Sequence, residues 1–93
     1  MKSIVQIDKE QVKNLSFSKK EVISTPEERK IRSQKLERSQ TLGNLLHSKV
    51  RIIFCTAEDQ VYEVNTTVWA VGPEYIVLKG GVTIPTNSIL SVE

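Results

Sequence analysis

The chain has 93 residues and a mass of 10.5 kDa, which is enough for one domain with a short tail or arm. With 39% apolar and 26% charged residues, it is too hydrophobic to be wholly disordered and too polar to span a membrane. One Cys and one His exclude a disulfide framework and leave no cluster for zinc, so we expect no metal or cofactor.

The formal net charge of +2 is unevenly shared along the chain. Residues 1–47 hold ten Lys and Arg against six Asp and Glu, whereas residues 48–93 hold three against five. The N-terminal half is therefore basic and polar, and the C-terminal half is nearly neutral. This excess is milder than nucleic-acid-binding domains usually show.

The first residues do not resemble a targeting signal. Residues 1–7 have one Lys and few strongly apolar residues before Asp8, and no apolar run approaches the length of a bilayer span. We therefore expect a cytoplasmic protein without a membrane partner.

Residues 1–24 show only weak patterns, and part of them is expected to be disordered. Residues 3–7 favour a short strand. Asp8 followed by Gln11 favours a short helix over residues 9–16, and the stretch 16–25 resembles a linker.

A longer helix is predicted over residues 26–42. Thr25 can cap it, Pro26 suits the first helical position, and Glu28 completes a capping box, while Gly43 and Asn44 offer a stop.

This helix has little apolar face, because Ile31 and Leu36 lie about 140° apart on its circumference. It is expected to be held by local pairs, by light docking or by a partner chain. Its basic residues wrap around most of the helix, which favours a solvated helix; a phosphate-binding arm is the alternative. They are Arg29, Lys30, Arg32, Lys35 and Arg38.

The C-terminal half predicts five strands separated by turn signals. They cover residues 50–56, 61–71, 75–79, 82–84 and 89–92, with a loop at 57–60, a Gly80-Gly81 hairpin and a helical turn at 86–88. The second strand is unusually long and changes phase, as bent strands do. The fold class predicted is mainly β with an N-terminal helix (α+β): a partly flexible helical arm, 1–47, and a five-stranded antiparallel small barrel, 48–93.

No set of catalytic residues emerges. His47 is expected to be a connector, Cys55 a small buried hydrophobe, and the Glu58-Asp59 pair a solvated hairpin tip. We therefore expect no enzyme and no small-molecule substrate.

Trp69 and Tyr75 permit two interpretations. In a barrel this small, bulky aromatic residues more often fill the core or cover an open end. On an exposed face they would stack on nucleic-acid bases instead.

The C-terminal half also resembles known proteins. Residues 50–92, with a long bent second strand, a Gly-Gly hairpin and an Ile-Pro-Thr-Asn-Ser-Ile turn, resemble the Sm-like and Src-homology-3-like small barrels. The segments 66–71 and 79–85 also resemble a family of short uncharacterised bacterial proteins, chiefly from Bacteroidetes. This likeness covers residues 41–93 and implies no particular activity.

The function predicted is a non-enzymatic interaction module that binds a protein partner or a second copy of itself through a barrel edge and the N-terminal helix. Single-stranded RNA or DNA binding by an Sm-like barrel is the alternative. The possible partner or nucleic-acid contacts are Arg29, Arg32, Lys35, Arg38, Trp69 and Tyr75.

Overall fold

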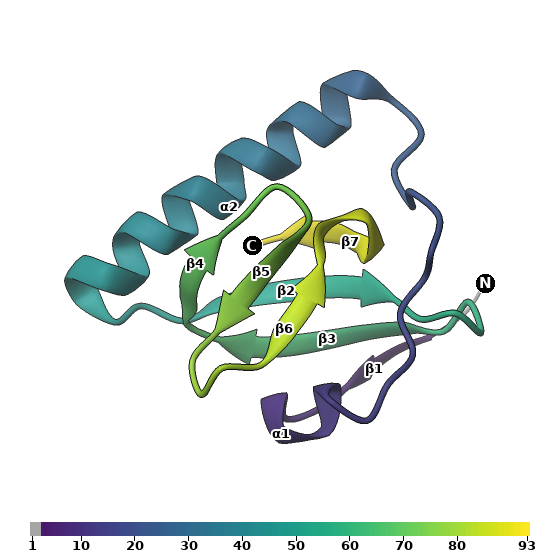
Figure 1. Ribbon diagram of the computed structural model, residues 1–93, viewed down its shortest axis with the longest axis horizontal. Coiled ribbons are helices and arrows are strands. Elements are labelled where there is room, and N and C mark those ends of the chain that lie inside the picture. Colours follow the sequence, from purple (N-terminus) through teal and green to yellow (C-terminus); the bar gives the residue numbers. More distant parts are fainter. Residues whose placement is uncertain (1–2) are drawn as a thin grey trace.

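The structure is a computed structural model that describes residues 3–93 (Figure 1). Its elements in chain order are β1 (Ile4–Gln6), α1 (Lys9–Val12), α2 (Pro26–Leu46), β2 (Val50–Cys55), β3 (Val61–Thr66), β4 (Val68–Val71), β5 (Tyr75–Leu78), β6 (Thr83–Pro85), the 3-10 turn η1 (Thr86–Ser88) and β7 (Ile89–Val92). Most elements are strands and one helix is long, which confirms the mixed α+β class.

The strands form two sheets. One has the order β1-β3-β2-β7 and the other the order β4-β5-β6. All pairs are antiparallel except β1 with β3. The two sheets are not closed into a barrel by strand pairing. The predicted strand 61–71 is continuous in the chain but divides at Thr67 into β3 and β4, one in each sheet.

Several predicted boundaries are confirmed and others are wrong. The hairpin turn is built by Gly80 and Gly81, whose φ angles of 92° and 86° suit glycine, and the predicted turn at 86–88 is η1. The short helix predicted over 9–16 stops at Val12. Pro85 ends β6 instead of lying beyond it, because β6 is an edge strand whose outer side needs no N–H donor.

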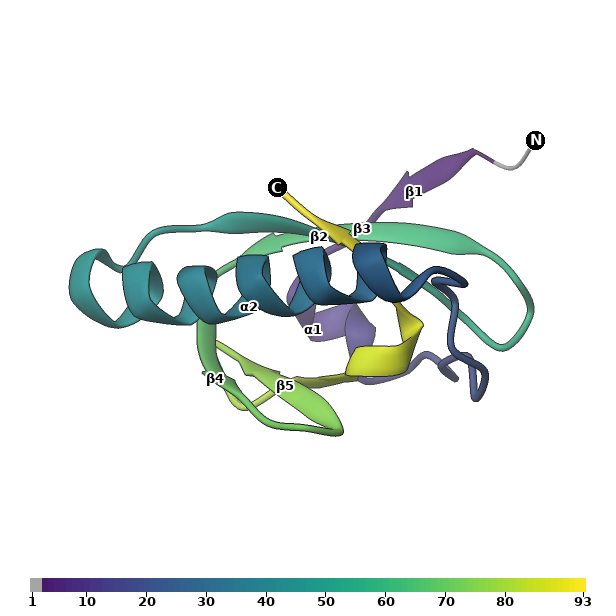
Figure 2. The same ribbon diagram turned by 90° about the horizontal axis from the view of Figure 1, so that it is seen from above.

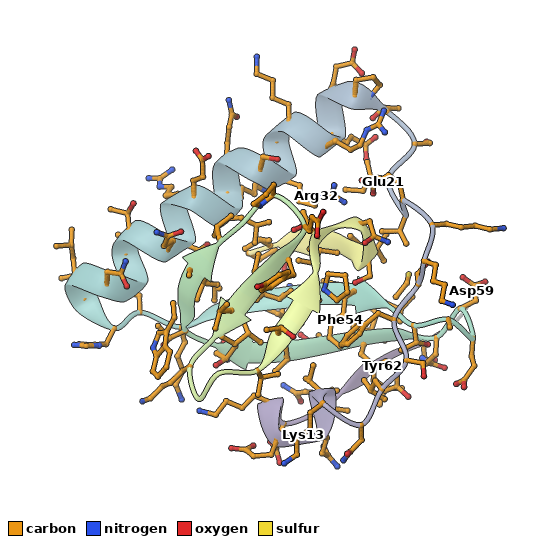
Figure 3. All side chains as sticks on the ribbon, in the orientation of Figure 1. Lys13, Glu21, Arg32, Phe54, Asp59 and Tyr62 are labelled. Carbon is orange, nitrogen blue, oxygen red and sulfur yellow. The ribbon has the colours of Figure 1, made fainter. Side chains whose placement is uncertain are left out.

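The core lies between the sheets and α2. Its fully buried side chains include Ile52, Phe54 and Ile76. The rings of Phe17 and Tyr62 lie 5.6 and 5.9 Å from the ring of Phe54, measured between centroids. Phe54 and Tyr62 are labelled in Figure 3. Val12 and Leu36 come from outside residues 48–93 and are part of the same cluster.

Helix α2 continues to Leu46, so the predicted stop at Gly43 is wrong. Its N-terminus and the Thr25 cap are confirmed: the Glu28 amide donates to Thr25 Oγ1 at 3.3 Å. The Glu28 side chain does not return a bond to the Thr25 amide, so the predicted capping box is wrong. It ends at His47, whose left-handed backbone (φ 54°) allows the His47 amide to donate to the Gly43 carbonyl at 3.0 Å. His47 is thus the helix cap, within the connector that the sequence predicts.

The buried stripe of α2 is mostly polar or small, and α2 packs beside β4 and β7 (Figure 2). The buried residues are Arg32, Leu36, Ser39 and Gly43, whose spacing of four, three and four places them on one face. Leu36 is the one large apolar residue in this stripe, which is why the sequence predicts so little docking.

The segment between α1 and α2 is held to β2 and η1 by backbone hydrogen bonds. The Ser18 amide donates to the Cys55 carbonyl at 3.3 Å, and the Val22 amide donates to the Asn87 carbonyl at 2.9 Å. Residues 1 and 2, where the predicted disordered segment begins, lie outside the described residues.

Candidate functional site

The outward side of β4 and β5 carries two large aromatic side chains. Along β5, Ile76 and Leu78 point into the core, so Tyr75 and Val77 point outward. A bulge in β4 shifts the register so that Val68 pairs with Leu78 but Ala70 pairs with Val77. The extra residue is Trp69, and Trp69 and Ala70 are both exposed. We call Trp69, Ala70, Tyr75 and Val77 the outer hairpin face.

Trp69 is 47% exposed and Tyr75 is 51% exposed, so the prediction that they fill the core is wrong. The interior is already occupied by aliphatic side chains from the same strands, namely Val68, Ile76 and Leu78, all fully buried. The bulge also releases Trp69 from the regular alternation that would have set its direction. Both aromatic groups are therefore available to a partner.

A shallow, mainly apolar pocket of about 270 Å³ lies at the turn end of this hairpin. It is lined by Ala70, Val71, Gly72, Pro73, Glu74, Tyr75 and Val77. The pocket extends the outer hairpin face toward the β4–β5 turn, and Glu74 is its one charged residue.

The last turn of α2 adds two more exposed apolar residues, Leu45 (72% exposed) and Leu46 (68% exposed). This turn lies beside the start of β4. A Cβ atom on Gly43 would stand 2.6 Å from the carbonyl oxygen of Val68, the residue before Trp69. The last turn of α2 therefore lies close to the start of the outer hairpin face.

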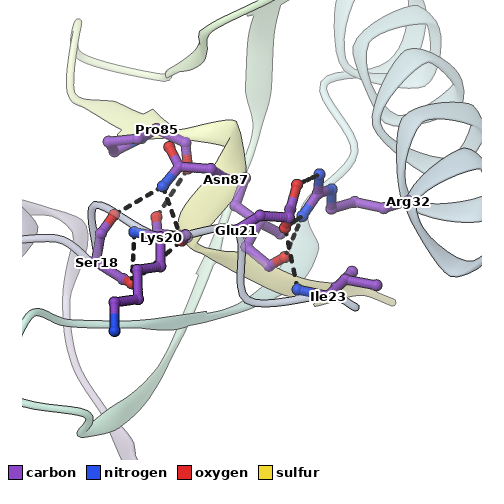
Figure 4. A network of polar contacts seen from close by, with 9 residues as sticks. Ser18, Lys20, Glu21, Ile23, Arg32, Pro85 and Asn87 are labelled. Atoms are coloured by element: carbon purple, nitrogen blue, oxygen red, sulfur yellow. Dashed lines mark hydrogen bonds and ion pairs between the residues drawn. The ribbon is translucent and has the colours of Figure 1, made fainter. Parts of the chain in front are cut away.

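Arg32 is buried at the contact between α2 and β7 (Figure 4). Its Nη1 donates to the Ile89 carbonyl at 2.9 Å and to Glu21 Oε2 at 2.8 Å, and its Nη2 donates to Glu21 Oε1 at 2.6 Å. The Ile23 amide also donates to Glu21 Oε2, at 3.0 Å. The hydrogen bonds from Arg32 hold the pKa of Glu21 below its usual value, against a smaller opposing effect of burial.

The structure does not gather the predicted cationic contacts around the aromatic residues. Arg32 is already bound to Glu21, and Arg29 lies close enough to Glu21 to help lower its pKa. Lys35 lines a small groove beside β7, in the other sheet from Trp69. Arg38 is exposed on α2.

Other chemistry is sparse in the part of the chain that the structure describes. Cys55 is buried, as predicted. Within residues 3–93, no group of three or more His, Cys, Asp or Glu side chains is arranged to hold a metal ion. None of the helices described is both long and apolar enough to cross a membrane.

Comparison of the chain with protein-family models, curated proteins and solved structures gave no match. The candidate site is therefore assigned from the geometry of the structure alone. Sequence analysis missed the Glu21–Arg32 pair, because its partners are eleven residues apart and lie on different segments. It also missed Leu45 and Leu46, because the predicted helix ended at residue 42. Leu45, two residues after Gly43, lies on the side of the helix away from the buried stripe, and this position was the signal that could have indicated its exposure.

Proposed function

We propose that the chain is a cytoplasmic, non-enzymatic interaction module that binds a second copy of itself through the outer hairpin face and the last turn of α2. The observation that carries this proposal is the half-exposure of Trp69 and Tyr75 on one apolar face. Exposed aromatic residues are typical anchors of protein interfaces, and isolated proteins rarely leave large apolar patches uncovered.

We propose further that the two sheets form an open small barrel with Sm-like or Src-homology-3-like strand order. The one-residue link at Thr67 between β3 and β4, and η1 leading directly into β7, support this topology. Membership of the bacterial family named above stays a prediction.

Sedimentation at micromolar concentration tests self-association. We expect a species larger than 10.5 kDa, and we expect Trp69→Ser with Tyr75→Ser to return it to a monomer. The matched control is Ile4→Ser with Val5→Ser, which removes exposed apolar groups from the edge strand β1 and should leave the assembly intact.

A monomer at micromolar concentration would overturn the proposal. An assembly that is lost only in the β1 control would show pairing through that sheet edge, and would equally contradict a contact through the outer hairpin face.

Single-stranded RNA or DNA binding remains a second candidate, because the exposed Trp69 and Tyr75 rings offer stacking surfaces. Labelled poly-U and poly-A at about 50 mM salt test it, since phosphate contacts are strongest at low salt. Binding that falls steeply with salt and is lost in the Trp69→Ser, Tyr75→Ser variant is the result expected of this function; no binding would exclude it.

A further inference from the structure

A polar pocket of about 490 Å³ lies between α1 and the bend at which β3 passes into β4. Three lysines from distant parts of the sequence line it: Lys9 begins α1, Lys49 precedes β2, and Lys79 follows β5. We call this the lysine pocket. Folding alone brings these three lysine residues to one pocket, because no two of them lie on the same element.

Two contacts fix the geometry on the side of the β5–β6 hairpin. The Lys79 amide donates to the Thr67 carbonyl at 2.9 Å, which ties Lys79 to the β3–β4 bend. A Cβ atom on Gly80 would stand 3.8 Å from both Cε and Nζ of Lys9. The Lys9 side chain therefore lies against the residue next to Lys79.

The lysines outnumber the carboxylates that line the pocket by three to two, so the formal charge of the lining is +1. Asp8 and Glu10 also line the pocket, yet no carboxylate in residues 3–93 forms an ion pair with any of the three lysines. The side-chain amides of Gln6 and Asn65 add neutral hydrogen-bond donors to the lining. Such a set of donors suits an anion with several oxygen atoms.

We propose that the lysine pocket binds the phosphate groups of a small phosphorylated ligand. Lysine ammonium groups are compact charges that bind phosphate well, and their hydrogen bonds to it are charge-assisted. The pocket volume lies within the range of ordinary ligand sites, about 300–1,000 Å³. Its lining shares no residue with the outer hairpin face, so this proposal and the proposed self-association can fail separately.

Calorimetric titration of the full chain with inorganic pyrophosphate and with ATP tests the proposal, at about 20 mM salt where screening is weak. We expect binding of at least one of them. Replacing Lys9, Lys49 and Lys79 by Ala should weaken it by about tenfold or more, because charge-assisted hydrogen bonds are lost. The matched control replaces Lys19, Lys30 and Lys35 by Ala, which changes the net charge equally, and should leave affinity within about twofold.

Amide chemical shifts provide a readout that does not depend on the variants folding. Pyrophosphate should move the signals of Asn65, Thr67 and Lys79 in the wild-type chain. Absence of binding, equal weakening in the control, or shifts elsewhere would overturn the proposal. Binding of a single-stranded oligonucleotide without binding of pyrophosphate or ATP would also overturn it, in favour of nucleic-acid binding.

Discussion

Arg32 carries a charge into the contact between α2 and β7, where an unpaired guanidinium group would be costly. Glu21 accepts hydrogen bonds from both terminal nitrogens of Arg32, and the Ile89 carbonyl accepts a further one. The same carboxylate accepts from the Ile23 amide, so it also fixes the chain just before α2. One ion pair thus joins three segments of the molecule.

Glu21→Gln should lower the free energy of unfolding at pH 7 by about 1–2 kcal/mol, less than for a fully buried pair because the Glu21 carboxylate is partly exposed. The pKa of Glu21 is lowered in the folded state, so its contribution is complete above the unfolded value of 4.5 and is lost as the pH falls through the folded value. Urea unfolding at pH 7 and at pH 3 measures this difference.

The control for this prediction is Glu37→Gln, which removes an exposed carboxylate from α2 itself. It should change stability at pH 7 by less than about 0.5 kcal/mol, as surface substitutions usually do. If the two variants have equal stability at pH 7, or if Glu21→Gln loses as much stability on acidification as the wild type, the ion pair does not have this role.

At the scale of the element, α2 approaches β4 closely because Gly43 has no side chain. Gly43→Ala would place a methyl group 2.6 Å from the Val68 carbonyl oxygen and 2.9 Å from Thr67 Cγ2. Alanine favours helix by about 1 kcal/mol over glycine, but overpacking costs about 1–3 kcal/mol and the backbone oxygen cannot move aside cheaply. We expect a net loss of about 1–2 kcal/mol in thermal or urea unfolding.

The neighbouring position supplies the control. Asn44 is exposed on the same turn of α2. Asn44→Ala should therefore raise the free energy of unfolding by up to about 0.5 kcal/mol, through helix propensity alone. If Gly43→Ala stabilises the protein as much as Asn44→Ala does, α2 does not pack this closely on β4.

The docking of α2 also shows what sequence alone can predict about an element. The cap at Thr25 and the proline at the first position fix where the helix starts, because these are local interactions. Its buried face could not be predicted from hydrophobicity, because Arg32, Ser39 and Gly43 are buried through a hydrogen-bonded ion pair, a backbone contact of the Ser39 hydroxyl and close packing.

At the scale of the whole molecule, most strands of the C-terminal half were predictable because turn residues such as Gly72, Pro73, Gly80 and Gly81 separate them. The division of the long strand into two sheets was not, and neither was the outward direction of Trp69, because both depend on a break at Thr67 and a bulge after Val68. The parallel pairing of β1 with β3 joins residues 57 positions apart, for which the sequence gives no local signal.

The lysine pocket likewise has no local signal in the sequence. Lys9, Lys49 and Lys79 are unremarkable in the sequence, and only the packing of α1 beside the hairpin brings them together. Candidate sites made by a single segment, such as the basic residues of α2, can be proposed from sequence. Sites that three segments build require the fold.

The N-terminal residues complete the core, which makes the stability of the C-terminal strands depend on them. Val12 is fully buried in the main cluster, and its segment is tied to β2 through the Ser18 amide. Val12→Ala should therefore lower the free energy of unfolding by about 2 kcal/mol, from lost burial and the cavity left behind.

Val5→Ala is the matched substitution, since Val5 lies exposed on β1, and it should cost less than about 0.5 kcal/mol. Hydrogen exchange adds a readout along the chain: in Val12→Ala, amides of β2 and β3 should lose protection together with those of the N-terminal segment, because they share one core. Loss of protection confined to residues 3–24, with the strands as protected as in the wild type, would show instead that the N-terminal segment is a separable arm.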